Sequence, residues 1–398
     1  MEETKLTCAA LPLRADESIY ALVIGSREGM RSLMGSHTDH LRRFIEPLEW
    51  AVKPQVCCLI GDEGAGIGVQ EDRAEDPQTF PGMAVRLLRL RYDAGLPGWT
   101  ILPCAEAEHN AEHLKEAMIA CAAQWQLPRG FLRWMLEENR FCSTLTDCAE
   151  WLVETSDPGQ IPVQEAAGAV RLVDDLAPYR LRRRRMLGGA GMLVAAVGFL
   201  CGLGAIGPCM RDEDLRALLG KALTEEMLPT LPFERNEGLE YAARVCAYLE
   251  NACGAEAWPR MGENLAARFV QCVLPVLADS EKQEGVLPNC LCFALSALIM
   301  LYAGVRRNGE GAYILASENG DAEVWDAQRV LAAFSRMSCD MPPESLAYAA
   351  LSDREVWGCD LREIEGLEDK ETSQLRDMQL LGVREAMKNS AFASGRGD

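Results

Sequence analysis

The chain has 398 residues, of which 40 are lysine or arginine and 60 are aspartate or glutamate, so its formal net charge at pH 7 is −20. This length is enough for two or three domains with a large core. The acidic balance argues against nucleic acid as a partner, because phosphate binding needs a basic face. No basic segment followed by an apolar run opens the chain, so we predict no secretory signal. We expect the 16 cysteines to be free thiols in a reducing cytoplasm.

Short apolar runs alternate with helical segments in the first part of the chain. Strand character is expected in residues 5–13, 18–25, 55–60 and 99–103. Helices are expected over residues 41–50, 80–94 and 129–139. A further helix is expected near Asn110, whose side chain is placed to cap it. Buried strands that alternate with helices are typical of a parallel sheet covered on both faces.

The pattern changes after a polar, turn-rich segment at residues 154–167 and a last predicted strand at residues 170–176. From Tyr179 onward the periodicity predicts only helices, at residues 214–226, 236–251, 263–277, 288–303, 324–336 and 343–351. We therefore predict an α/β domain over residues 1–178 and an all-helical domain over residues 179–398.

Between the two predicted domains lies a long uncharged stretch. Five arginines between Arg180 and Arg185 precede twenty-five residues without a charge, Met186 to Met210. Length and hydropathy alone fit a transmembrane helix with a basic flank, and they also fit a helix buried at the centre of a large soluble protein. Seven glycines between Gly188 and Gly207 favour the buried helix, so no membrane partner is expected.

Several blocks of sequence resemble the polyol-specific long-chain dehydrogenases, the mannitol dehydrogenase family, and within it the tagaturonate reductases, also called altronate oxidoreductases. The blocks, which keep their order along the chain, are GWTILPCAEAEHNAEHLKE at 98–116, NRFCSTLTD at 139–147, VRLVDDLAPYRLR at 170–182, LTEEMLPTL at 223–231 and GVLPNCLCFALSALIMLYAGVRRNGE at 285–310. The resemblance implies a Rossmann-like N-terminal domain and a helical C-terminal domain. It also implies hydride transfer between NAD and a sugar acid or polyol without a metal.

The resemblance further implies that the central stretch is a buried helix that carries the catalytic side chains. In the family a lysine donates the proton to the developing alkoxide. An asparagine five residues later and another asparagine from the sheet domain stabilise the oxygen, and a histidine binds substrate. The shared VDDLAPYR block aligns these positions with Arg183, Gly188 and Gly191, and the second asparagine with Asn110.

Three of these four positions depart from the family pattern. A guanidinium with a pKa above about 12 does not release a proton at neutral pH, so Arg183 cannot replace the lysine. Glycine at 188 and at 191 supplies no side chain. A shifted alignment does not help, because no lysine occurs between Lys115 and Lys221 and no histidine occurs after His113.

The positions that the resemblance assigns to substrate are only partly kept. Asp147 matches the family, and Cys148 replaces an arginine. In the substrate segment of the helical domain Asn251 is kept, but Glu256 stands at a histidine position, where a carboxylate would repel a sugar acid.

The cofactor positions are also reduced. The chain is expected to begin at the strand that follows the family's first strand and glycine-rich turn. Gly61, Asp62 and Glu63 follow a predicted strand, but two carboxylates would face a pyrophosphate, so they indicate NAD binding only weakly. The G-x-G-x-x-G match at residues 202–207 is expected to close the buried helix instead.

Three smaller patterns have structural interpretations that we favour. His109 and His113 are one helical turn apart, as in a zinc site, but a solvated helix face explains them, and no metal is predicted. The paired cysteines, Cys57 with Cys58 and Cys290 with Cys292, are expected to be small buried residues. The arginine run is expected to form ion pairs with residues 174–175 or 212–214.

We therefore predict a tagaturonate reductase-like homologue that is catalytically impaired, a pseudoenzyme of cytoplasmic location. Two alternatives remain open: an active tagaturonate or fructuronate reductase with an altered site and a misplaced start, and a non-catalytic protein-binding scaffold. A sugar acid is the expected small-molecule partner of the active form. The oligomeric state is not predicted.

Overall fold

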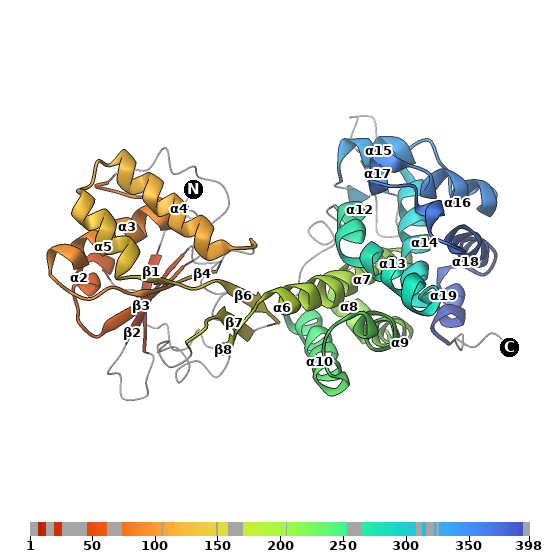
Figure 1. The fold of residues 1–398 in the computed structure, drawn as a ribbon. Helices are drawn as coiled ribbons and strands as arrows, with labels where there is room; N and C mark the ends of the chain where they lie inside the picture. The colour runs from red at the N-terminus through yellow and green to blue at the C-terminus, as the bar shows by residue number, and fades with distance from the viewer. Residues whose placement is uncertain are drawn as a thin grey trace. The chain divides into compact units, whose positions relative to one another are not determined.

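The computed structural model describes residues 7–12, 20–25, 46–61, 74–104, 107–148, 150–157, 170–203, 205–252, 264–307, 313–315, 322–323 and 326–392. The chain divides into two compact units, Met1–Ala177 and Pro178–Asp398 (Figure 1). The expectation of an α/β part followed by a helical part is confirmed.

The first unit is built on a five-stranded sheet in the order β1-β2-β3-β4-β5. The strands are β1 (Thr7–Pro12), β2 (Tyr20–Gly25), β3 (Val56–Gly61), β4 (Thr100–Pro103) and β5 (Arg140–Phe141). Strands β2 to β5 pair in parallel, as in a Rossmann-like sheet. The predicted parallel sheet is confirmed for β2 to β5, and the edge strand β1 runs antiparallel to β2, which the sequence did not predict.

Both faces of this sheet are buried, which explains why its strands are continuous apolar runs. Leu22, Ile24 and Leu59 belong to one core cluster, together with residues from the helices α3 (Phe80–Asp93), α4 (Asn110–Gln124) and α5 (Arg129–Glu137). Ala21, Val23 and Ile60 point to the opposite face, as the two-residue period of a strand requires. The short helix α2 (Pro47–Ala51) packs against α3.

A second, three-stranded sheet covers the other face. Its strands are β6 (Thr144–Asp147), β7 (Glu150–Glu154) and β8 (Val170–Val173), in the order β6-β7-β8. Trp151 and Val153 of β7 pack into the same cluster as Ala21 and Val23. Of these three strands the sequence predicted only β8, as the last strand before the helical part, and the structure confirms a strand at Val170–Val173. Its partner is β7, which the sequence did not predict.

Arg91, near the end of α3, contacts the backbone of two segments, the one before β3 and the one before β4. Its side chain is buried, with 1 % of its surface exposed. The guanidinium donates to the carbonyl oxygens of Pro97 at 2.5 Å, Ala51 at 3.0 Å and Lys53 at 3.2 Å, and lies 4.9 Å from the ring of Trp99. Burial lowers the pKa of Arg91 to about 10, so the group stays charged at neutral pH. One buried cation therefore binds three carbonyl groups from three positions in the chain, of which that of Ala51 is buried.

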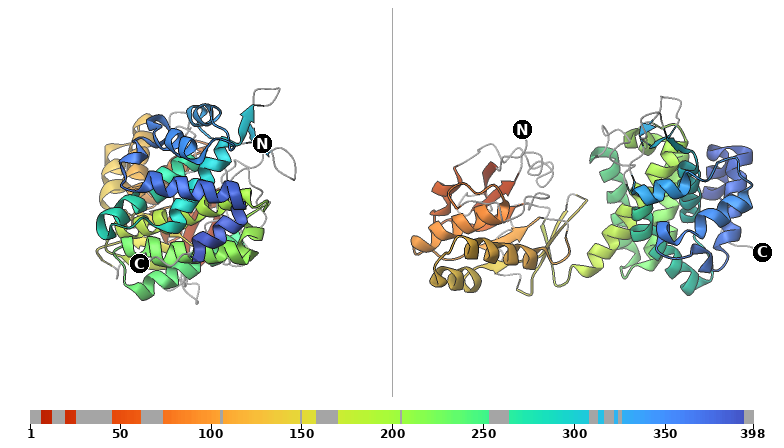
Figure 2. Two further views of the ribbon diagram at one scale, coloured as in Figure 1. Left: turned by 90° about the vertical axis from the view of Figure 1, so that its right-hand side faces the viewer. Right: turned by 90° about the horizontal axis from the view of Figure 1, so that it is seen from above.

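The second unit is mainly helical (Figure 2). Its first helices are α6 (Ala177–Arg182), η5 (Arg183–Gly188), α7 (Gly189–Leu200), α8 (Ile206–Arg211), α9 (Glu213–Lys221), η6 (Ala222–Met227), η7 (Leu228–Thr230) and α10 (Arg235–Ala252). The later ones are α12 (Leu265–Arg268), η8 (Phe269–Val273), α13 (Leu274–Glu284), α14 (Asn289–Ala303), α15 (Gln328–Phe334), α16 (Pro343–Leu351), α17 (Arg354–Trp357), η9 (Leu361–Glu363), α18 (Leu367–Leu381) and α19 (Val383–Phe392). Segments η5, η6 and η8 are π-helical.

The prediction that no strand follows Tyr179 was wrong. Three short strands, β9 (Val305–Arg307), β10 (Tyr313–Leu315) and β11 (Ala322–Glu323), form a small antiparallel sheet after α14. They are two or three residues long, so they carry too few alternations for a sequence pattern to show.

The uncharged stretch forms a buried helix, as predicted, and every residue of α7 from Gly189 to Gly198 is buried. The helix α14, apolar on almost all sides, packs against it. Helix α7 ends at Leu200, and Gly202, two residues later, has a φ of +72°, a left-handed conformation that glycine adopts at no steric cost. The predicted structural role of this glycine is therefore confirmed.

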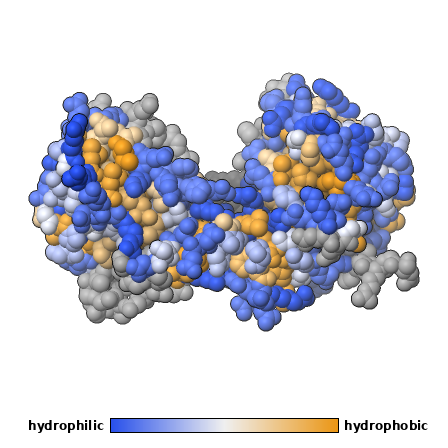
Figure 3. All heavy atoms as spheres, in the orientation of Figure 1, coloured by the Kyte–Doolittle hydropathy of each residue, from blue (hydrophilic) through white to orange (hydrophobic). Residues whose placement is uncertain are grey.

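Within the described residues, no helix combines the length and apolar character that a membrane crossing requires. Figure 3 shows hydrophilic residues spread over the visible face of both units, with smaller hydrophobic areas between them.

We predict that Arg91→Lys lowers the free energy of unfolding by about 1–3 kcal/mol, because a lysine ammonium cannot reach three separate carbonyl groups and leaves at least one unsatisfied. Arg89→Lys is the matched control on the same helix. Arg89 pairs with Asp93 on the surface, so the change there should stay within about 0.5 kcal/mol. Thermal unfolding of both variants checks this, and equal losses would contradict the role given to Arg91.

Candidate functional site

The helix η5 and the start of α7 hold three of the positions that sequence reasoning selected. Arg183 begins the π-helical segment, Gly188 ends it, and Gly191 lies in the first turn of α7. A π-helix joins residue i to residue i+5, so Arg183 and Gly188 are one π-turn apart. A Cβ atom at Gly188 would lie 4.0 Å from the carbonyl oxygen of Arg183. Arg183 and Gly188 therefore lie one above the other on the same side of the helix.

A neighbouring cysteine occupies the space beside Gly188. A Cβ atom built on Gly188 would lie 2.5 Å from the Sγ atom of Cys272, which is on η8. Such a distance is far inside van der Waals contact, so the thiol fills the volume into which a side chain at 188 would extend. At Gly191, by contrast, an added Cβ atom would meet no atom of another segment within 4 Å.

Arg182 and Arg185 anchor η5 on its two sides. Arg182 is fully buried, and its guanidinium lies 5.1 Å from the ring of Tyr179, 4.9 Å from that of Phe233 and 3.9 Å from that of Tyr241. Its Nη1 atom is 3.5 Å from Glu237. These contacts combine cation–π attraction on a buried guanidinium with an ion pair to a partly exposed carboxylate.

Arg185 makes the second anchor. It donates to the carbonyl oxygen of Thr230 at 2.9 Å and to Asp279 at 2.5 Å. We expected Asp212 among the partners of the arginine run. It forms an ion pair with Arg384 at 2.8 Å, outside that run. The cations that flank Arg183 thus hold the helix in place.

The electrostatic surroundings of Cys272 are positive. Burial raises the pKa of its thiol, and the charges of Arg184, Arg268 and Arg183 act in the opposite direction. The thiol is 8 % exposed. A negative group near η5 would therefore meet three positive charges, although the chain as a whole is acidic.

Asn110 lies in the first unit and has a different local role from the one predicted. The cap residue of α4 is His109, in the left-handed conformation with φ of 54°, so the prediction that the Asn110 side chain caps the helix was wrong. Asn110 is fully buried. Its Nδ2 donates to the carbonyl oxygens of Pro103 at 3.3 Å and Thr144 at 3.0 Å, and its Oδ1 accepts from the Thr144 amide at 3.1 Å. The side chain therefore joins the end of β4 to the start of β6.

Of the remaining substrate positions, the structure describes two. Asp147 ends β6 and is 1 % exposed. Asn251 lies exposed on α10, where its Nδ2 donates to the carbonyl oxygen of Ala247 at 2.8 Å. Glu256 lies outside the described residues.

The expected nucleotide positions are described only at Gly61, and Asp62 and Glu63 lie outside the described residues. A Cβ atom at Gly61 would be 2.0 Å from the ring of Phe80, so close packing explains this glycine. The start of α3 is already capped, since Gly82 N donates to Thr79 Oγ1 at 3.1 Å.

Two other described helix starts beside the main sheet have acidic neighbours. Glu46 precedes α2, and Glu112 lies in the first turn of α4. A pyrophosphate binds at a helix start through free amides and the positive end of the helix dipole, which a nearby carboxylate opposes. The starts of α2 and α4 are therefore poorly suited to a pyrophosphate.

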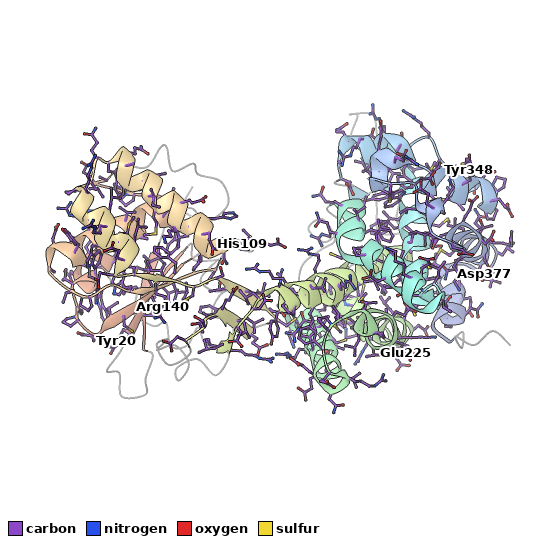
Figure 4. All side chains as sticks on the ribbon, viewed as in Figure 1. Tyr20, His109, Arg140, Glu225, Tyr348 and Asp377 are labelled. Carbon is purple, nitrogen blue, oxygen red and sulfur yellow. The ribbon has the colours of Figure 1, made fainter. Side chains whose placement is uncertain are left out.

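The two histidines with zinc-like spacing are both exposed, at the start of α4 (Figure 4 labels His109). Among the residues that the structure describes, no group of three or more histidine, cysteine or acidic side chains is placed to hold a metal ion.

Sequence reasoning missed Cys272 and the aromatic surroundings of Arg182. Cys272 is one of many cysteines, and nothing in its sequence neighbourhood points to Gly188, 84 positions earlier. Tyr179 lies directly before the arginine run, but Phe233 and Tyr241 are distant from it in sequence. Only the fold shows that they meet Arg182.

We predict opposite effects for two alanine substitutions in the central helix. Gly191→Ala should stabilise the protein by about 0.5–1 kcal/mol, because alanine is the better helix former and space is available. Gly188→Ala should destabilise it by about 1–3 kcal/mol through collision with Cys272. Chemical denaturation measures both.

The double variant Gly188→Ala with Cys272→Ala supplies the control, since removal of the thiol frees the space. It should be more stable than the sum of the two single changes predicts, which a double-mutant cycle detects. Strict additivity would show that the two residues do not compete for one volume.

Comparisons with known proteins agree with this fold. The family model for the mannitol dehydrogenase C-terminal domain matches residues 175–379. The chain is 30 % identical to the altronate oxidoreductase of Klebsiella pneumoniae (strain 342) over 355 residues, which are 80 % of this chain and 72 % of that protein. It is 30 % identical over 390 residues to the altronate oxidoreductase of Yersinia enterocolitica, covering 87 % of this chain and 79 % of that one.

Two solved structures have a similar fold. The structure of a D-sorbitol dehydrogenase in substrate-free form superimposes with a TM-score of 0.64 and 17 % identity, over 86 % of this chain and 76 % of that chain. The Pseudomonas fluorescens mannitol 2-dehydrogenase, solved with NAD and D-mannitol, gives a TM-score of 0.52 and 16 % identity, over 96 % and 82 %. Together with the family match and the two relatives, they show that the chain belongs to the mannitol dehydrogenase family.

Proposed function

We propose that this protein is a catalytically impaired, tagaturonate reductase-like member of its family. One observation carries the proposal: the chain has no lysine between Lys115 and Lys221 and no histidine after His113. Reduction of a ketone adds a hydride to the carbonyl carbon and a proton to its oxygen, so the site needs a group that gives up a proton near neutral pH. Arg183, at the position that the resemblance assigns to the donor, does not do so.

The packing around η5 supports the same proposal. The resemblance places an oxygen-stabilising amide at 188, and here the Cys272 thiol fills the space beside that glycine. A thiol is a weak hydrogen-bond donor, and burial raises its pKa further, so it is a poor substitute for an amide that stabilises an oxyanion. Asn110, at the other amide position, has both ends of its amide bonded to backbone groups.

A second candidate function is sugar-acid binding without turnover. The positive charges of Arg183, Arg184 and Arg268 around the Cys272 thiol favour it, because a sugar-acid carboxylate would be attracted there. Binding of an anion needs no proton donor. This function would survive the changes at 183, 188 and 191.

The experiment compares this protein with an altronate oxidoreductase assayed in parallel. NADH consumption is followed with tagaturonate or fructuronate as substrate, and the melting temperature is recorded with and without NADH. We expect no NADH consumption above the blank. A ligand that binds the native state raises its stability, so a protein that does not bind NADH should show no shift in melting temperature when NADH is added. NADH oxidation that depends on both protein and sugar acid would overturn the proposal.

The melting temperature measured with tagaturonate, in the absence of NADH, distinguishes the two candidate functions. A rise in melting temperature with tagaturonate, weakened in Arg183→Gln, favours sugar-acid binding. The absence of any rise leaves the impaired homologue without a ligand at this site.

A further inference from the structure

Glu371 is a fully buried carboxyl group, far in sequence from the candidate site. It lies on α18 with none of its surface exposed, and its Oε2 atom is 2.5 Å from Ser296 Oγ of α14. The other oxygen, Oε1, is buried and has no hydrogen-bond partner among the described residues, and the Cys292 thiol, a weak donor, is a neighbour. A charged carboxylate with one oxygen unsatisfied and out of water is strongly unfavourable, so this geometry suits the protonated acid.

The carboxyl group belongs to a polar network that joins three helices. Ser296 Oγ is 3.5 Å from Gln374 Oε1 on α18. Gln374 Nε2 donates to the carbonyl oxygen of Asn289 at 3.0 Å, and Asn289 Nδ2 donates to the carbonyl oxygen of Ser390 on α19 at 2.6 Å. The helices α14, α18 and α19 pack against one another (Figure 2). A change in the charge of Glu371 would therefore affect the hydrogen bonds that join α18 and α19 to α14.

Burial disfavours a negative carboxylate at Glu371 more strongly than the neighbouring groups favour it. Burial raises the pKa of Glu371 to about 8, while Ser296, Lys370 and Cys292 act in the opposite direction. The first turn of α14 already receives a second buried carboxyl group, because Cys290 N and Leu291 N donate to Glu226 at 2.8 Å and 3.0 Å.

Other charged groups on the elements that pack against α18 are engaged in ion pairs. They are Glu344 with Arg376, Asp360 with Arg362, Glu363 with Arg354, Arg384 with Asp212, and Glu385 with Lys388.

We propose that Glu371 is a proton-operated latch: in its protonated form it holds α18 and α19 on α14, and its ionisation at alkaline pH releases them. The sign follows from proton linkage. The folded state keeps the proton up to about pH 8, whereas the unfolded group loses it near its ordinary value of 4.5. The stability that Glu371 contributes is therefore complete below pH 4.5 and is lost as the pH rises to about 8.

Hydrogen exchange of the intact protein between pH 6 and 9, corrected for the intrinsic pH dependence of exchange, tests the latch. We expect α18 and α19 to lose protection relative to α10, with the opening constant rising by up to about tenfold per pH unit until the group is ionised. Glu371→Gln keeps the shape and removes the titration, so its protection should stay constant. Asp369→Asn, an exposed acid on the same helix, should behave like the wild type.

Constant protection in the wild type, or an equal loss in Glu371→Gln, would overturn the proposal. The infrared spectrum of the wild type gives a test that does not need the variant to fold. The carbonyl band of a buried protonated carboxyl group should be present at pH 6 and absent at pH 9. A spectrum without this band at pH 6 would also overturn the latch.

Discussion

The burial of one helix that is apolar on all sides determines the arrangement of the second unit. An α-helix without a polar face is stable in water only if other elements surround it, and α7 is enclosed by α14, η8 and other helices. The segment η5 continues directly into α7, so the packing of α7 also sets the position of Arg183 and Gly188. Arg182, among three aromatic rings, and Arg185, paired with Asp279, complete this arrangement.

This constraint separates the fold of the site from its chemistry. The helix that the family uses for catalysis stays in place through apolar burial and two flanking arginines, and neither requires a proton donor. At 188 the Cys272 thiol fills the space beside the glycine, and at 191 an added Cβ atom would meet no atom of another segment within 4 Å. The fold of this helix therefore does not depend on side chains at 188 and 191, and under the proposed function a family member keeps its structure without its reaction.

The sequence predicted the features that depend on local pattern. Strands β2, β3 and β4 are continuous apolar runs and were found with nearly correct ends. The buried central helix was found by its lack of charge, although the uncharged stretch runs past the end of α7 into α8. The antiparallel pairing of β1, the strands β6 and β7 with their separate sheet, and the short strands after α14 were missed. Their pairing depends on contacts between distant segments, which a single-sequence pattern does not contain.

The candidate site shows the same limit. Resemblance located Arg183, Gly188 and Gly191, and the structure places them together on η5 and α7. It could not show that Cys272 fills the space beside Gly188, nor that the amide of Asn110 is committed to Thr144. Nor could the sequence show that Glu371 is buried, because burial of a charged residue is decided by its neighbours in space.

The central claim is that the buried helix keeps its place without a group able to protonate an alkoxide. Transfer of deuterium from NADH labelled at the transferable C4 position to tagaturonate, with protein in excess and detection of the sugar-acid product by mass spectrometry, tests this claim most directly. The account predicts that no deuterated product forms beyond the protein-free blank. Formation of deuterated altronate in amounts that follow the protein concentration would contradict it.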